Sequence, residues 1–537
     1  MANTLKFGDG KWGAKKDSIL AYNDENANFK PLPFTTSRAS TATRINKAGL
    51  IEKVENGIPR VDYLGSTKGA MLLEPQSTNL IRYSEAFGNS YWTKSGATIQ
   101  GDPSTAGSEL VTNGSFTGSA TGWTLGLGWS YGTNNLTVSS STANLSQSGI
   151  VSVNKLYLVS YEISGYVSGS VNSNVGGIVT GRLGNSNQIV SEYIYTSSVV
   201  NDIFYITANS FTGSIDNVSV KEVQGFASPS AETPLGALKL VEDTSTGLHD
   251  IAKINFNVLA VKYNCSILVK PNGRNEVRLT LDNYFQGNTN AFFNLETGVI
   301  SLGVEAENGV IETLSNGWFR CSFTSKSVAI AGSGGRLFIQ TSVGNNVSYQ
   351  GDGTSGVYIF GAQVEAQSYA TSYIPNYGES AGVTRLAESC SQTPPDGVIG
   401  QTEGTMFIDV TGKTQVNSAR YIAIGNIGDA TNRLLIYQYS NLINVYNGAG
   451  TPFNITYNPP SGRLKMALAY SVGDYAFYVN GVQVFTNSNN AVPTCSKVSF
   501  GMNEITGQLI IPSIGYNETK LYNTRLSNSE LQALTTI

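Results

Sequence analysis

Aromatic and carboxylate side chains between residues 108 and 224 are the groups in this sequence best suited to hold a ligand. A sugar is bound by flat aromatic faces against the apolar side of its ring and by amides or carboxylates at its hydroxyls. Trp129 and Tyr131 stand two positions apart, so both rings can lie on one face of a strand. A place in the core is the alternative for Trp123 and Trp129. The candidate carbohydrate-binding residues are Trp123, Trp129, Tyr131, Tyr193, Tyr195 and Asp202.

The sequence holds few residues that could form a catalytic site. His249 is the sole histidine, which excludes a metal site or a proton shuttle built on two imidazoles, and it lies near no nucleophile elbow. A glycosidase needs two carboxylates a short distance apart. Glu162, Glu192 and Asp202 are candidates, but each stands in a strand or turn context where a solvated carboxylate is usual. We therefore expect no catalytic residue, with a glycan-degrading enzyme as the alternative.

The cysteines and the remaining loop motif indicate no cofactor. No two of the four cysteines lie within ten positions of each other, which excludes a CxxC zinc or redox motif. We expect buried free thiols in a protein made in a reducing cytoplasm. Asp352 lies in a glycine-rich loop that lacks the lysine of a phosphate loop, so we expect a tight turn there.

The elements that position these residues are predicted to be β-strands. Only 13% of the 537 residues are charged, whereas 58 are glycine and 28 are tyrosine, a composition typical of sheet surfaces. Alternating segments such as Tyr157–Ile163, with Asn-Gly turns between strands, predict an all-β, multi-domain chain of sandwiches or jelly rolls. One helix is predicted after a capping box at Ser527–Glu530.

The charge pattern and the apolar runs exclude two kinds of partner. The net charge is −4 and no basic block occurs, so we expect no nucleic acid. Apolar runs fall far short of the ~18 residues that a membrane helix needs, so we expect no membrane insertion. The first residues, Met1–Lys6, hold no apolar segment, so we expect no secretory signal.

Internal echoes predict that one domain is inserted into another. The opening segment Leu80–Phe87 is echoed by Leu110–Phe116, and the closing segment Ser214–Val220 is echoed by Gly356–Val364. Two opening segments in succession, followed by two closing segments, indicate that the second domain is inserted into an early loop of the first, since insertions are tolerated in exposed loops. The predicted units are an irregular N-terminal attachment segment at 1–70, a discontinuous sandwich at 71–107 and 225–388, an inserted jelly roll at 108–224, and a C-terminal sandwich at 400–537.

A series of motifs outside the insert is similar to one known family. In chain order the motifs are Arg38–Asn46, Gly49–Glu52, Ile58–Tyr63, Leu72–Leu80, Tyr91–Lys94, Asn316–Cys321, Gly361–Glu365, Tyr369–Pro375 and Thr384-Arg385. This series resembles the phage head spike fibre family of tailed-phage virion proteins, also labelled tail fibres, over about residues 35 to 390. The resemblance implies a homotrimer. We expect the irregular, charge-dense N-terminal segment to dock on a phage capsid or tail protein, with Arg38, Arg44 and Arg60 as candidate attachment residues.

The insert resembles a jelly-roll carbohydrate-binding module on Leu110–Phe116, Trp123 and Ile215–Val220. Such modules often hold a structural calcium with a glutamate after the Asn-Gly-Ser-Phe run and a late aspartate. Here Thr117 stands at the first position, a departure that puts the metal in doubt. Asp216 matches the second position and is the one calcium candidate.

The C-terminal unit resembles a concanavalin-like, laminin-G type sandwich on Phe477–Gly481 and Leu521–Leu534. Together the resemblances imply a structural bacteriophage virion fibre, most simply a capsid (head) fibre. Its sandwich domains would bind host or environmental glycans weakly and at many copies. A tail fibre or receptor-binding protein is the first alternative. A bacterial surface glycan-binding protein is a further one.

Overall fold

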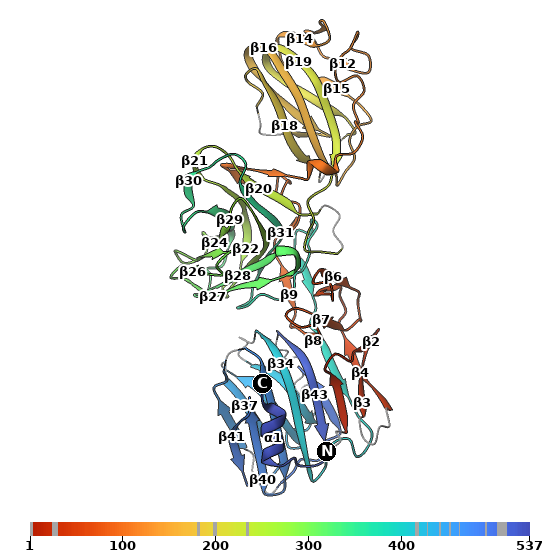
Figure 1. Cartoon of the computed structure of the whole chain (residues 1–537), viewed down its shortest axis with the longest axis vertical. Helices are drawn as coiled ribbons and strands as arrows, with labels where there is room; N and C mark the ends of the chain where they lie inside the picture. The colour runs from red at the N-terminus through yellow and green to blue at the C-terminus, as the bar shows by residue number, and fades with distance from the viewer. Residues whose placement is uncertain are drawn as a thin grey trace.

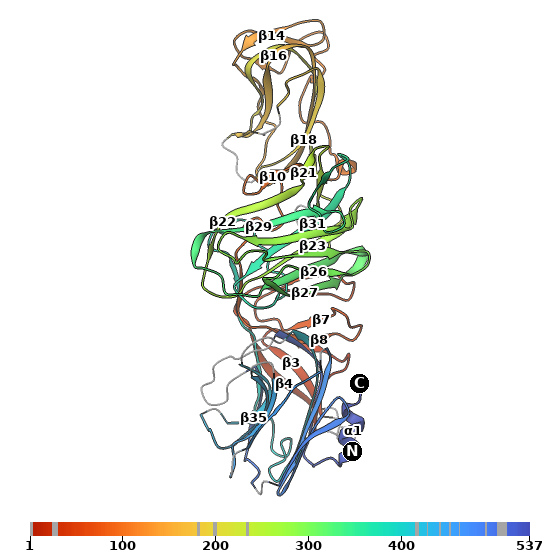
Figure 2. The same cartoon turned by 90° about the vertical axis from the view of Figure 1, so that its left-hand side faces the viewer.

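The computed structural model describes residues 4–537 apart from 24–29, 180–182, 197–200, 232–235, 414–417, 427, 440–441, 451–452, 461, 489–490 and 502–512. The described residues form β-sheets and a single α-helix, so the predicted all-β, multi-domain class is confirmed. Three β-modules follow one another along the long axis of the molecule (Figure 1, Figure 2). We call them the lower module, the middle module and the insert.

The lower module joins both ends of the chain in one system of strands. Its N-terminal strands are β1 (Leu5–Gly8), β2 (Gly13–Lys15), β3 (Ser18–Asn23), β4 (Lys30–Ser37), β7 (Arg60–Asp62) and β8 (Ala70–Leu73). Its C-terminal strands are β33 (Ser389–Gln392), β34 (Glu403–Lys413), β35 (Ser418–Gly425), β36 (Arg433–Tyr439), β37 (Leu442–Asn447), β38 (Phe453–Tyr457), β39 (Leu464–Ser471), β40 (Asp474–Val479), β41 (Val482–Asn487), β42 (Lys497–Phe500) and β43 (Ser513–Tyr522).

The N-terminal segment is part of this module, and the predicted boundary at residue 70 differs from the structure. β1 and β8 both pair with β43, and β4 pairs with β33. Phe7 and Phe34 pack against Phe500, with ring centroids 5.3 and 6.0 Å away. The segment is too irregular to form a core of its own. The partner surface that it needs is the C-terminal sandwich of the same chain.

Two short antiparallel pairs form the neck above the lower module (Figure 1). One is the hairpin of β5 (Ala42–Ile45) and β6 (Ile51–Val54). The other is β9 (Ser77–Asn79) with β32 (Val383–Arg385), which pair residue by residue from Ser77↔Arg385 to Asn79↔Val383. β9 leads into the middle module and β32 leads out of it, so the two chain crossings run side by side.

The middle module is a sandwich of two six-stranded sheets. One sheet holds β10 (Thr93–Ser95), β22 (Asp250–Val258), β29 (Gly332–Ser342), β24 (Glu276–Asp282), β25 (Asn290–Asn294) and β26 (Ile300–Leu302). The other holds β11 (Ala97–Gln100), β20 (Leu238–Glu242), β31 (Gly356–Glu365), β23 (Asn264–Asn272), β28 (Phe319–Ser325) and β27 (Ala306–Thr313). The small pair β21 (Thr246–Leu248) and β30 (Ser348–Gln350) lies beside them, with 3-10 turns at Pro103–Thr105 and Ser315–Gly317. β11 pairs with β20 across the insert, so the chain path is nested.

The insert forms the upper module around its own core. Its strands are β12 (Thr124–Leu125), β13 (Trp129–Tyr131), β14 (Leu136–Ser141), β15 (Leu145–Gln147), β16 (Leu156–Val175), β17 (Ile178–Val179), β18 (Gln188–Tyr195) and β19 (Phe204–Val223). The 20-residue strands β16 and β19 pair along most of their length, and their register shifts between Ser164 and Ser170. The alternation predicted at Tyr157–Ile163 is confirmed within β16, where every second side chain is buried.

The single described helix, α1 (Asn528–Thr535), covers the outer face of the lower module. Ser527 and Glu530 form the predicted capping box in both directions. Leu531 is fully buried against Phe407 and its neighbours. No helix in the described part of the chain is long and apolar enough to cross a membrane.

Candidate functional site

The two tryptophans of the candidate sugar site lie in the core of the insert. Trp123 is 8% exposed and Trp129 is 6% exposed. The indole N–H of Trp123 donates to the Thr112 carbonyl at 3.1 Å, and that of Trp129 donates to the Ala143 carbonyl at 2.8 Å. Trp129 also stacks on Phe211 at 6.1 Å. Neither ring presents a face to a ligand, so the core alternative holds for both.

Tyr131 and Asp202 are exposed but belong to different parts of the insert. Tyr131 ends β13, an edge strand, and its hydroxyl donates to Asn134 Oδ1 at 3.3 Å. Asp202 precedes β19, and its main-chain carbonyl accepts from Ile150 and Val151. Among the described residues, no hydrogen bond or ring contact joins Tyr131 to Asp202.

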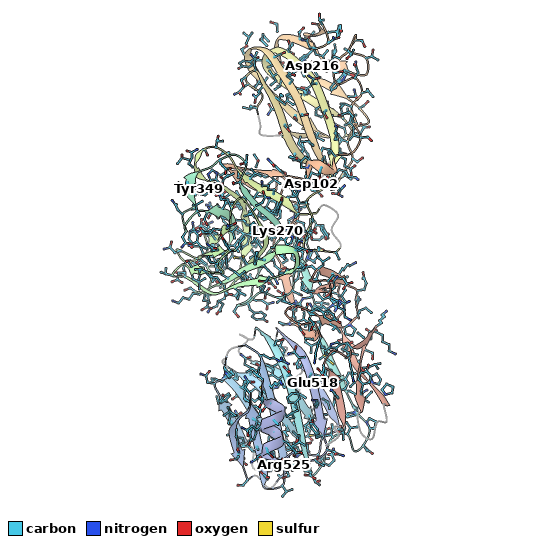
Figure 3. All side chains as sticks on the ribbon, in the orientation of Figure 1. Asp102, Asp216, Lys270, Tyr349, Glu518 and Arg525 are labelled. Atoms are coloured by element: carbon cyan, nitrogen blue, oxygen red, sulfur yellow. The ribbon has the colours of Figure 1, made fainter. Side chains whose placement is uncertain are left out.

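Tyr193 and Tyr195 lie at the joint between the insert and the middle module. Tyr195 is 8% exposed and belongs to the core of the middle module, together with Leu156 and Val223 of the insert. Tyr193 is half-buried against the same core. Burial raises the pKa of Tyr193, and the Asp102 carboxylate at the joint adds to the effect (Figure 3). The six predicted residues therefore do not form one surface.

The calcium candidate Asp216 lies far from the middle module (Figure 3). It is aligned with Glu162 on the neighbouring strand. Partial burial and the Glu162 charge raise the pKa of Asp216, while a hydrogen bond from the Asn217 main chain opposes the shift. No group of three or more histidine, cysteine or carboxylate side chains that could hold a metal occurs in the described part of the chain.

The other chemistry-bearing residues serve the fold. His249 is fully buried, with Nδ1 2.6 Å from the Gly96 carbonyl and Nε2 3.1 Å from the Tyr349 carbonyl. All four cysteines are buried free thiols, as predicted, and burial raises the pKa of Cys495 to about 12. Hydrogen bonds from Ser355 and Thr354 lower the pKa of Asp352 and close the predicted tight turn.

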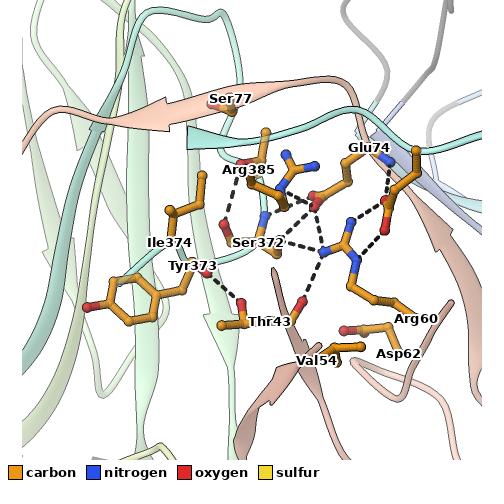
Figure 4. Close-up of polar contacts among 12 residues, drawn as sticks. Thr43, Val54, Arg60, Asp62, Glu74, Ser77, Ser372, Tyr373, Ile374 and Arg385 are labelled. Atoms are coloured by element: carbon orange, nitrogen blue, oxygen red, sulfur yellow. Dashed lines mark hydrogen bonds and ion pairs between the residues drawn. The ribbon is translucent and has the colours of Figure 1, made fainter. Parts of the chain in front are cut away.

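A buried set of ionic side chains occupies the neck (Figure 4). We call Arg38, Arg60, Glu74, Arg385 and Glu388 the neck cluster; each is at most 3% exposed. The guanidinium of Arg60 forms a bidentate ion pair with the carboxylate of Glu388, through Nε at 2.8 Å and through Nη2. Its Nη1 lies 2.9 Å from a carboxylate oxygen of Glu74. Arg38 donates to Glu388 at 3.1 Å. The cluster thus links the ends of β4, β7, β8, β32 and β33.

The charges of the neck cluster stabilise one another. Burial alone would raise the pKa of Glu74, but Arg385, Arg60 and hydrogen bonds from Ser372 outweigh it and hold that pKa well below its usual range. Burial alone would lower the pKa of Arg60, but Glu388 and Glu74 outweigh it and raise that pKa. The pair is therefore fully ionised at neutral pH. Removing one partner of such a pair leaves an uncompensated buried charge.

Two of the three predicted attachment residues are thereby placed inside the protein. Arg38 is 3% exposed, and it also donates to the carbonyls of residues 54 and 55. Arg60 is fully buried. Neither side chain can contact another protein, because the carboxylates that satisfy both lie on this chain. Arg44 alone is part-exposed, on the β5–β6 hairpin, where it pairs with Glu52 at 2.9 Å.

Glu74, Arg385 and Glu388 were not predicted from the sequence to have a role. Glu74 and Arg385 do stand in the motif series, directly beside apolar or small residues in a chain with few charges. That context predicts that the charged side chains are buried. It does not predict which residues they pair with, because partners such as Arg60 and Glu388 are 328 positions apart in the sequence.

No family model and no curated protein matches this chain. Among solved structures, the Ruminococcus gnavus IT-sialidase CBM40 bound to α2,3 sialyllactose is 17% identical, covers 26% of this chain and 84% of its own, and has a TM-score of 0.24. A leech intramolecular trans-sialidase is 16% identical over 26% of this chain and 24% of its own, at 0.23. The binding domain of botulinum neurotoxin DC in complex with rat synaptotagmin II is 12% identical over 28% of this chain and 40% of its own, at 0.23. Similarities this low carry no argument about function.

Proposed function

We propose that the chain is a structural fibre subunit of a bacteriophage virion, most simply a head fibre, that presents β-modules for weak multivalent binding to glycans. The observation that carries the proposal is the convergence of the fibre-family motifs on the neck cluster. Four of its five members belong to that motif series: Arg38, Arg60, Glu74 and Arg385. Their contacts hold together the two chain crossings of an elongated molecule. A projecting fibre needs a stiff connection between its modules, and the ion pairs of the neck cluster supply one.

The structure changes how such a fibre would dock. The N-terminal strands are paired into the lower module, so the docking surface would be a face of that module and not a free arm. The insert stands at the opposite end and would face outward. Trimerisation would multiply weak glycan contacts, since linked sites raise avidity by about 10² or more. The role proposed is binding and structure, without catalysis.

Immunogold labelling of intact virions tests this proposal. The antibody should be raised against the insert, because the lower module would be covered at the attachment site. Label spread over the capsid is the expected result. Label confined to the tail would replace the head fibre with a tail fibre. Purified particles without label would overturn the virion role, and hydrolysis of host polysaccharide by the purified chain would then favour the glycan-degrading alternative.

A further inference from the structure

Exposed aliphatic side chains gather at one end of the middle module. At this end three connections cross from one sheet to the other: 259–263 between β22 and β23, 303–305 between β26 and β27, and 326–331 between β28 and β29. All residues from 250 to 342 are described, so these connections contain no gap. We call this surface the loop end, and its apolar members are Leu259, Val261, Leu302, Val304, Val328 and Ile330. Each of the six is 38–69% exposed.

Hydrogen bonds hold the three connections of the loop end together. The main-chain N–H of Ala329 donates to the Val261 carbonyl at 3.0 Å, and that of Lys326 donates to the Glu305 carbonyl at 2.8 Å. The aliphatic side chains therefore share one ordered surface. Single exposed apolar residues are normal, whereas a contiguous group of them marks a place of interaction. Because the loops are already ordered, association costs them little conformational freedom.

The charges of the loop end cancel. Its charged side chains are two lysines and two glutamates: Lys262, Lys326, Glu305 and Glu307. Lys262 and Glu307 pair at 2.6 Å, and Arg336 pairs with Asp282 on the neighbouring strands at 3.8 Å. A surface without excess charge attracts neither a polyanion nor a basic protein. It does match a second copy of itself, since each sign on one copy can meet the opposite sign on the other.

The position of the loop end also suits contact between copies. The strands of the middle module run across the long axis of the molecule (Figure 2). Loops at the ends of these strands therefore lie on the flank, away from both the insert and the lower module. Two molecules that stand side by side can bring their flanks together and leave the far ends of both modules free.

We infer that the loop end is the surface through which this chain packs side by side with a second copy of itself. The six side chains are aliphatic, so they offer no flat ring on which a sugar could stack. Removing them from water drives association, and the surrounding ion pairs form a polar rim. The inference rests on the proposed function for a fibre of several copies and adds the surface that joins them.

Two substitutions on the loop end test the inference in the full-length protein. Val304→Glu and Ile330→Glu each place a carboxylate where an apolar side chain would be buried between copies, which is costly without a partner. Val299→Glu is the matched control, because Val299 is also an exposed valine (58% against 69% for Val304) but lies at the opposite end of β26. All three positions are exposed in the single chain, so each variant should fold, and circular dichroism with thermal melting checks this.

Size-exclusion chromatography with light scattering and sedimentation velocity measure the mass over a range of concentrations. We expect the parent to form a species heavier than the 57.2 kDa single chain and to keep it at high salt, because apolar contacts are not screened. Val304→Glu and Ile330→Glu should each weaken self-association by about tenfold or more, as the loss of a central interface contact does. Val299→Glu should keep the mass of the parent.

A parent that stays a single chain at every concentration overturns the inference, as does a multimer that both loop-end variants leave intact. Flotation of a single-chain parent with phosphatidylcholine vesicles, lost in Val304→Glu, would also overturn it, because the loop end would then contact a bilayer. None of these results touches the labelling of virions, which tests the proposed function separately. A multimer that Val304→Glu dissociates, together with unlabelled particles, would keep the surface and remove the fibre role.

Discussion

The middle module is joined to the insert by an apolar core, whereas at the neck a buried ionic cluster stands beside the apolar packing of Ile51 against Trp318 and Phe360. At the insert, Leu156, Tyr195 and Val223 extend the apolar core of the middle module, and packing of this kind is non-directional. At the neck, Arg60 holds Glu74 and Glu388 by charge-assisted hydrogen bonds, which fix geometry. The difference teaches that Arg38 and Arg60, which the sequence suggested as attachment residues, build an internal joint.

The largest effect is expected from breaking the neck cluster. Arg60→Met removes the cation that serves both carboxylates and leaves Glu388 and Glu74 partly uncompensated. Removal of one partner of a buried ion pair costs about 3–5 kcal/mol. Urea unfolding followed by circular dichroism should show that loss in the transition of the lower and middle modules.

Arg44→Met is the control for this variant. Its ion pair with Glu52 is part-exposed, and such pairs contribute about 0–1 kcal/mol. Equal destabilisation by the two substitutions would contradict the contrast between a buried joint and a surface pair.

The next effect tests the insert. Trp129→Ala deletes a core ring and should cost about 3 kcal/mol of insert stability, whereas Tyr131→Ala at the exposed edge should change it by less than about 0.5 kcal/mol. Limited proteolysis should cut the Trp129 variant within 108–224 and spare the rest. Cleavage spread over all modules would show that the insert is not an independent folding unit.

A pH effect of about 2 kcal/mol is expected at Glu74. Its pKa is lower in the folded state than in the unfolded chain. Its stabilisation is therefore complete above the unfolded pKa of about 4.3 and is lost as the pH falls towards the folded value. The raised pKa of Arg60 adds no loss in this range. The stability difference between the parent and Glu74→Gln should be about 2 kcal/mol smaller at pH 3 than at pH 7. An unchanged difference would mean that folding does not shift the pKa of Glu74.

The smallest effect is a change in thiol reactivity. Cys265 and Cys321 lie in the middle module, Cys390 and Cys495 in the lower module, and the insert has no cysteine. Burial keeps all four thiols inaccessible, so Ellman's reagent should react slowly with the parent. Arg60→Met should speed the reaction and Trp129→Ala should not. Faster reaction in the Trp129 variant would show that the core of the insert is coupled to the modules that hold the cysteines.

Sequence predicted local features well and long-range partnerships poorly. The alternating pattern predicted β16 and the capping box predicted α1, because both signals lie in residues that are neighbours in the chain. The pairing of β1 with β43 joins residues more than 500 positions apart and has no local signal. Trp129 and Tyr131 share a strand, as expected. Their exposure depends on where that strand ends and on its place at the edge of the sheet, and neither can be predicted from the local sequence. The space between the middle and lower modules is lined by residues of both and could not be found from either one alone.

Small-angle X-ray scattering of the full-length chain tests the central claim, that the neck cluster is an internal joint, most directly. The parent should scatter as one elongated rigid particle, and Arg60→Met should broaden its distance distribution, while Arg44→Met should leave it unchanged. An Arg60→Met chain that keeps the parent scattering and melting temperature would contradict the claim, because Arg60 would then not hold the joint together.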